Sequence, residues 1–165
     1  MTETRPKVLV LGGPAGLHLD FVSSISRVRI RASTKTLRAG GVLPMCFGNI
    51  ELSPGLNLQL YGADRDRVEE AAAALGDGLI GAVVLVDDAD LEDPHYTVQV
   101  LEEVGARHLP AILGYAGSVA GPERIGRAFG ARAEWVVTDG RMDREAIKST
   151  LVSLFETAVS SAGAA

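Results

Sequence analysis

The chain has 165 residues, of which 47% are hydrophobic, and this fits one globular domain with an ordinary core. The formal net charge of −5 disfavours binding to nucleic acid or to an anionic membrane surface. The single cysteine, Cys46, excludes an internal disulfide and suggests a reducing compartment. The sequence has no apolar run long enough to span a membrane and no secretory signal pattern, so we expect a cytoplasmic protein.

Short apolar runs predict the strands of a sheet. Residues 8–11 form a continuous apolar run, as expected of a parallel strand that is buried on both faces. Residues 45–52 and 56–61 are separated by Ser-Pro-Gly, which predicts a hairpin. Strict alternation over residues 56–60 indicates that one face of that strand is partly solvated. Three further buried strands are predicted at residues 81–86, 111–113 and 135–137.

Helical periodicity fills the intervals between these strands. An amphipathic helix is expected after the first strand. The next two helices are predicted by apolar stripes, one of Val68, Ala71, Ala72 and Leu75 and one of Val100, Leu101 and Val104.

The last helix has the clearest pattern. Asp143 is its expected N-cap and Glu145 lies in its first turn. Its apolar face comprises Ile147, Leu151, Leu154, Phe155 and Ala158. Strands that alternate with helices, plus one hairpin, predict an α/β fold with a mostly parallel sheet of about six strands and one antiparallel edge hairpin.

A glycine-rich loop, residues 12–19, follows the first predicted strand. A phosphate-binding loop reads G-x-x-x-x-G-K-[ST]: its backbone N–H groups cradle phosphates, its lysine neutralises them and its hydroxyl holds Mg²⁺. Gly12 is in place, but Leu17, His18 and Leu19 stand at the last three functional positions. The frame therefore indicates nucleotide-binding ancestry, whereas the residues indicate that the activity is lost.

Four stretches together resemble the small Ras-like GTPases of bacteria, of the gliding-motility type and its conservon relatives. Residues 8–21 match the first strand and a loop that continues in the family as G-G-F-G-V-G-K-T-T-F, with the same length and the same final Phe. Residues 45–50 are similar to M-D-F-G-R-I, residues 60–67 to L-F-G-T-P-G-Q-D-R, and residues 80–87 to the central strand. The resemblance implies a Ras-like P-loop NTPase-type three-layer fold, with one G-domain over residues 7–159. From their polar or small residues, we expect the ends at 1–6 and 160–165 to be disordered.

The departures from this family fall on its functional positions. The resemblance places His18 at the phosphate lysine and Leu19 at the Mg²⁺ hydroxyl, and Leu17 replaces a glycine, so its side chain should obstruct the approach of backbone to phosphate. The residues before the second predicted strand, 41–44, lack the threonine of the first switch. The glycine and the water-orienting glutamine of the second switch fall on Arg65 and Asp66.

The guanine-reading motif is also missing, because Ala116 and Val119 stand where its Asn and Asp are expected. Phosphoryl transfer depends on electrostatic positioning, and the loss of one such contact typically costs a few kcal/mol. We therefore expect a pseudo-GTPase that is not an enzyme and uses no cofactor or metal. The degenerate nucleotide-site positions are Gly12, Gly13, Gly16, Leu17, His18, Leu19, Asp66, Ala116 and Val119.

A basic stretch marks the segment that corresponds to the first switch, and no Asp or Glu occurs between Phe21 and Ile50. One interpretation is a solvated loop, and the other is a contact surface for an acidic protein partner. The resemblance implies a roadblock-type dimer, a sensor-kinase-like protein or an active GTPase paralogue as partner, and self-association stays open. The partner-binding candidates are Arg27, Arg29, Arg31, Lys35 and Arg38, with Arg65 and Arg67 from the second switch.

Two other functions stay open. A divergent nucleotide-binding protein or GTPase could use His18 with a nonstandard Mg²⁺ ligand, and a small-ligand module could use the vacated site. The carboxylates at residues 87–93 fit no calcium-loop spacing, and acidic residues are favoured at a helix start in any case.

Overall fold

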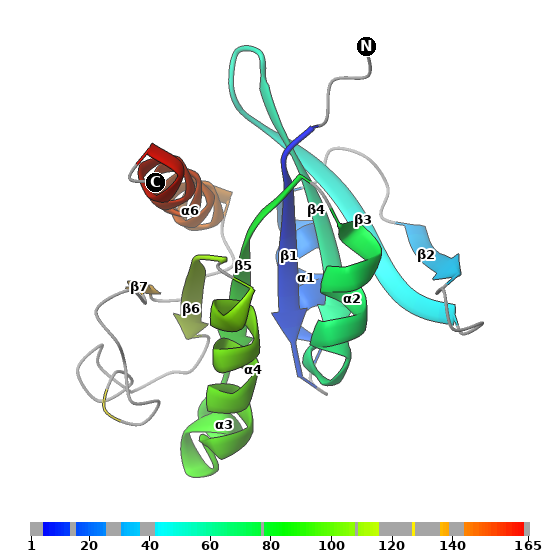
Figure 1. Cartoon of the computed structure of the whole chain (residues 1–165), viewed down its shortest axis with the longest axis vertical. Helices are drawn as coiled ribbons and strands as arrows, with labels where there is room; N and C mark the ends of the chain where they lie inside the picture. Colours follow the sequence, from blue (N-terminus) through cyan, green and yellow to red (C-terminus); the bar gives the residue numbers. More distant parts are fainter. Residues whose placement is uncertain are drawn as a thin grey trace.

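The structure is a computed structural model, and it describes residues 5–13, 16–25, 31–36, 42–76, 78–107, 109–115, 127, 136–138 and 144–163. These residues form a mixture of strands and helices (Figure 1). The strands are β1 (Lys7–Gly12), β2 (Arg31–Thr36), β3 (Val42–Ser53), β4 (Leu56–Asp64), β5 (Leu79–Val86), β6 (Ala111–Tyr115) and β7 (Val136–Thr138). The helices are α1 (Leu17–Ile25), the 3-10 turn η1 (Arg65–Arg67), α2 (Val68–Leu75), α3 (Asp88–Glu92), α4 (His95–Ala106) and α6 (Arg144–Gly163).

One sheet organises the described part of the chain, with seven strands in the order β2-β3-β4-β1-β5-β6-β7. β1 lies between β4 and β5 and runs parallel to both, whereas β3 is antiparallel to β2 and β4. The prediction of an α/β fold with a mostly parallel sheet and an antiparallel hairpin at one side is confirmed. The predicted position of this hairpin at the edge of the sheet is wrong, because β2 pairs with the outer side of β3 and forms the edge.

β2 is the strand that the sequence did not predict. Its residues read Arg-Ala-Ser-Thr-Lys-Thr and contain no apolar run. It pairs with β3 from Arg31 opposite Phe47 to Thr36 opposite Val42. Threonine favours strands, but a polar strand at a sheet edge gives no hydrophobic period to detect. The expected count of about six strands was therefore one too low for the described residues.

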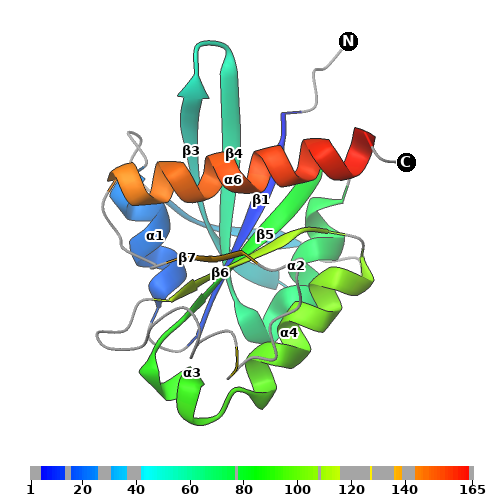
Figure 2. The same cartoon turned by 90° about the vertical axis from the view of Figure 1, so that its left-hand side faces the viewer.

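Two helical layers cover the sheet, so the three-layer arrangement is present (Figure 2). α1 and α6 pack on one face, where alternate strand residues such as Val8, Val10 and Leu60 are buried. α2 and α4 pack on the other face, over residues such as Leu9 and Leu11. The alternation places successive β1 side chains in the two opposite cores, which explains its continuous apolar sequence.

The local patterns predicted most helices correctly. All four residues of the first stripe in α2 are buried, as are the three of the stripe in α4. In α6, Ile147, Leu151 and Leu154 are fully buried, whereas Phe155 and Ala158 are only partly buried. The hairpin turn is as predicted, with Gly55 at φ 84°.

The chain ends differ from the expected boundaries. α6 continues to Gly163, so residues 160–163 are helical and not part of a disordered tail. The Ala- and Ser-containing end of α6 includes no helix-breaking proline, which is consistent with this extension. At the other end, the Pro6 carbonyl accepts a hydrogen bond from the Gln59 N–H at 3.0 Å. The expected N-cap, Asp143, lies outside the described residues.

Within the described residues, no helix is long and apolar enough to cross a membrane.

Candidate functional site

The glycine-rich loop closes on itself through its own backbone. Gly16 has a positive φ of 76°, which glycine adopts at low cost, and its N–H donates to the Gly13 carbonyl at 3.0 Å. The Gly16 carbonyl in turn accepts from the N–H groups of Leu19 at 3.0 Å and Asp20 at 3.3 Å, which starts α1. The Gly16 N–H is thus committed to the protein and is not free to cradle a phosphate.

His18, at the position of the phosphate lysine, folds back over the ends of β1 and β4. A Cβ atom on Gly12 would lie 2.6 Å from the His18 Nδ1, and one on Gly62 would lie 3.5 Å from its Cδ2. The ring therefore uses space that two glycines leave open. Its Nδ1 is buried and has no hydrogen-bond partner.

This placement decides the charge of His18. Burial lowers the pKa of the His18 imidazole below its usual value, although the carboxylates of Asp64 and Asp20 act in the opposite direction. The ring is therefore mainly neutral at pH 7. The position that supplies a permanent positive charge in a phosphate-binding loop supplies none in this chain.

The two leucines of the loop point in different directions. Leu17 is partly buried and packs against the core beneath α1 and α6. That Leu17 obstructs the approach of backbone to phosphate stays a prediction. Leu19 is 49% exposed, and its Cδ1 would lie 3.7 Å from a Cβ on Gly16. An aliphatic group thus replaces the Mg²⁺ hydroxyl, and the loop residues do not fit a bound magnesium ion.

Arg65 extends from η1 and lies against the glycine-rich loop. Its guanidinium carbon would be 3.0 Å from a Cβ on Gly13. Nη1 forms an ion pair with Asp90 Oδ1 and donates to Thr97 Oγ1 at 3.3 Å. The guanidinium also lies over the Tyr96 ring, 5.0 Å from its centroid. The Arg65 and Asp90 side chains are only 12% and 9% exposed, so water screens this pair weakly.

Asp90 is held in place by the start of α3. Its Oδ2 accepts from the Asp87 N–H at 3.0 Å, while Asp87 Oδ1 accepts from the N–H groups of Ala89 at 3.1 Å and Asp90 at 3.3 Å. This reciprocal capping box fixes the carboxylate that faces Arg65. The described residues contain no group of three or more His, Cys, Asp or Glu side chains that could hold a metal.

Asp66, at the position of the water-orienting glutamine, is bonded to α4. The Tyr96 hydroxyl donates to Asp66 Oδ1, and the Asp66 N–H donates to Asp64 Oδ1 at 2.9 Å. Burial and the Asp66 carboxylate raise the pKa of Tyr96 to about 12. Asp66 therefore acts as a hydrogen-bond acceptor for Tyr96.

The predicted partner-binding residues divide into four groups. Arg65 is largely buried and ion-paired, so it does not offer a free charge to a partner, contrary to its predicted role. Arg67 is half exposed, and its Nε donates to Glu70 Oε1 at 3.0 Å. Arg31 and Lys35 lie in the edge strand β2, opposite Phe47 and Leu43 respectively. The remaining candidates, Arg27, Arg29 and Arg38, lie outside the described residues. So do two of the predicted nucleotide-site positions, Ala116 and Val119.

Sequence reasoning missed Asp90, Tyr96 and Thr97, which converge on Arg65. One signal was present: an arginine at a position that the family fills with glycine introduces a cation that needs a carboxylate once it is buried. The acidic residues after β5 supplied a candidate. Their partner could not be identified, because Arg65 and Asp90 are 25 residues apart.

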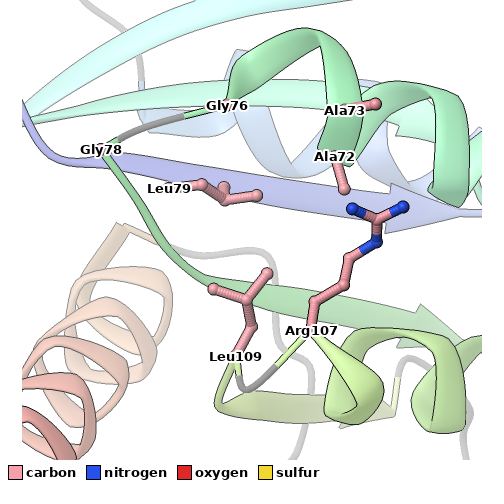
Figure 3. Close-up of a pocket in the computed structure, with 7 residues that line it drawn as sticks. All are labelled: Ala72, Ala73, Gly76, Gly78, Leu79, Arg107 and Leu109. Atoms are coloured by element: carbon pink, nitrogen blue, oxygen red, sulfur yellow. The ribbon is translucent and has the colours of Figure 1, made fainter.

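A cavity of about 380 Å³ lies away from this site, near the start of β5 (Figure 3). Small residues of α2 and the following loop line it, together with Leu79, Leu109 and Arg107. Arg107 also pairs with Glu103 of α4, with 3.4 Å between Nε and Oε1. None of the predicted site residues lines this cavity.

Comparison with known proteins supports the fold. No family model matches the chain, and no curated protein shows significant sequence similarity to it. Among solved structures it is similar to the cytosolic domain of the FeoB iron transporter of T. maritima in a GDP form, with a TM-score of 0.63, 13% identity and coverage of 96% of this chain. A second GDP form gives a TM-score of 0.60, 13% identity and 93% coverage, and a GMPPNP form gives 0.59, 15% and 93%. The chain spans 65%, 63% and 64% of the lengths of these three chains. The likeness shows that this chain has a fold similar to part of that cytosolic domain.

Proposed function

We propose that this chain is a pseudo-GTPase, a catalytically inactive protein with little or no GTP binding that acts through protein–protein interaction in a bacterial signalling or polarity module. The observation that supports this best is the inward, neutral His18 at the position of the phosphate lysine. Two further observations support the loss of nucleotide binding: Leu19 is exposed, and the Gly16 N–H already donates to the Gly13 carbonyl.

The electrostatics of the site also oppose nucleotide binding. Phosphates need a lysine, a metal ion or both to offset their charge, and each lost contact of this kind costs a few kcal/mol. Here the charges that act on His18 are the carboxylates of Asp64 and Asp20, which would repel phosphate. Micromolar binding corresponds to about −8 kcal/mol. Among the described residues, Arg65 places a positive charge against this loop, but Asp90 already neutralises it.

The proposed partner surface is the edge strand β2 together with the exposed part of η1. It carries Arg31 and Lys35 in β2 and Arg67 in η1. The sequence around β2, from Phe21 to Ile50, contains no Asp or Glu. An acidic surface would complement it. A roadblock-type dimer, a sensor-kinase-like protein or an active GTPase paralogue is the kind of partner that we propose.

Nucleotide titration tests the loss of binding. Any nucleotide that copurifies with the full chain is released and chromatographed, and fluorescent GTP and ATP are then titrated with Mg²⁺. An active Ras-like GTPase with an intact phosphate loop serves as the control. We expect no copurified nucleotide and no saturation in the micromolar range.

Saturable binding with a micromolar or lower Kd would overturn the proposal and favour the divergent nucleotide-binding protein. Thermal stabilisation by a metabolite, without any by nucleotides, would instead indicate a small-ligand module.

A further inference from the structure

We propose that Arg65 is an internal tether that takes the place of a bound nucleotide in holding the second-switch segment, residues 64–75, in one conformation. In switching GTPases this task belongs to the nucleotide phosphate and its Mg²⁺, and the segment loosens when they leave. This inference rests on the proposed function, because a tether is needed only where the nucleotide is absent.

Arg65 joins three parts of the chain that are far apart in sequence. It touches Gly13 after β1, Asp90 in α3, and Thr97 and Tyr96 in α4. A guanidinium has five N–H donors in a planar fork, so one side chain can hold several partners at once. A charge-assisted bond with little access to water is stronger than an exposed one.

The contact with Gly13 depends on the absence of a side chain. A Cβ at residue 13 would lie 3.0 Å from the guanidinium carbon and 3.1 Å from Nη2. The guanidinium therefore lies directly against the start of the loop. Asp90 already neutralises its charge, so Arg65 does not act as an attractor for phosphate.

A second contact fixes the same segment to α4. The Tyr96 hydroxyl donates to Asp66, and Asp64 accepts from the Asp66 N–H at the start of η1. α2 begins at Val68, directly after η1, and Val68 is buried. The first turn of α2 is therefore positioned from η1 as well as by its own core contacts.

Amide hydrogen exchange of the full chain tests the tether. Arg65→Ala should raise exchange over residues 64–75 by at least about tenfold. Without Arg65, this segment can open locally without breaking the ion pair to Asp90. Arg65→Lys keeps the charge but not the fork and should fall between wild type and Arg65→Ala. The matched control is Arg67→Ala, which removes an exposed pair from the same turn and should change exchange by less than about twofold. Unchanged exchange in Arg65→Ala would overturn the inference.

Thr97→Val provides a second route if Arg65→Ala does not fold. It removes only the hydroxyl that accepts from Arg65 Nη1 at 3.3 Å and should raise exchange over residues 64–75 while the fold is kept. Wild-type exchange in that folded variant would overturn the tether. Nucleotide binding by the wild-type chain would overturn the proposed function instead, so the two failures have separate readouts.

Discussion

Arg65 and Asp90 form an ion pair in which both side chains are about nine-tenths buried, and it connects the turn after β4 to the helix after β5. Asp90 is fixed from behind by the Asp87 N–H, and Arg65 is covered by Tyr96. The pair therefore joins two segments of the chain, η1 and α3, at a place with little access to water. This makes its contribution measurable by substitution.

Removal of one member of this pair should be costly. Asp90→Asn leaves the buried guanidinium without a counter-charge and should lower the free energy of unfolding by roughly 3 kcal/mol. Arg65→Met combined with Asp90→Asn should cost less than the sum of the two single substitutions, because no uncompensated charge remains. Urea unfolding of the four proteins in this cycle measures the coupling. Additive losses would show that the two side chains act independently.

His18 should make the stability depend on pH. Because the folded state has the lower His18 pKa, the unfolded state binds more protons as the pH falls below about 6.5. The free energy of unfolding should therefore decrease from about pH 7 toward about pH 5, until the pH passes the lowered folded value. His18→Phe keeps a ring without a titrating nitrogen and should flatten this part of the profile.

The control for this profile is His95→Gln, which removes an exposed imidazole at the start of α4. Denaturant unfolding at several pH values compares the three proteins. His18→Phe should also be more stable than wild type at low pH, since it removes a buried Nδ1 that lacks a partner. A wild-type slope in His18→Phe would assign the pH dependence to other groups.

The elements that were predicted correctly have an apolar pattern within their own residues. The stripes of α2 and α4 and the apolar runs of β1 and β5 reflect burial at fixed helical or strand periods. β2 escaped prediction because an edge strand can be polar, and the end of α6 because a small-residue helix lacks a hydrophobic period.

For the candidate site, the sequence predicted only which functional residues are missing. Motif positions showed that the lysine, the hydroxyl and the glutamine are absent. They did not show that Leu17 turns into the core, or that Arg65 turns inward to Asp90 rather than outward to a partner. Both outcomes depend on contacts between distant parts of the chain, which residue spacing does not encode.

Charge reversal tests the proposed partner surface. Arg29→Glu with Arg31→Glu should weaken capture of a roadblock-type or GTPase-paralogue bait by at least about tenfold, since like charges then face an acidic surface. Arg107→Glu, at the end of α4 and away from β2, is the control and should bind as wild type does. Pull-down followed by titration measures the effect. Equal affinity of the double variant and wild type would place the contact elsewhere.

Close packing at the end of β4 should make Gly62 intolerant of a side chain. A Cβ there would lie 2.3 Å from the Cys46 Sγ, so Gly62→Ala should lower the free energy of unfolding by about 2 kcal/mol through overpacking. Cys46→Ala in the same chain removes the clashing sulfur and should recover part of the loss. Gly105→Ala is the matched control, because a Cβ at that exposed position of α4 meets no atom within 4 Å and should stabilise the helix by up to about 1 kcal/mol. Thermal and urea unfolding of all four proteins measures these changes in the free energy of unfolding. An equal loss with and without Cys46 would show that the sulfur is not the obstacle.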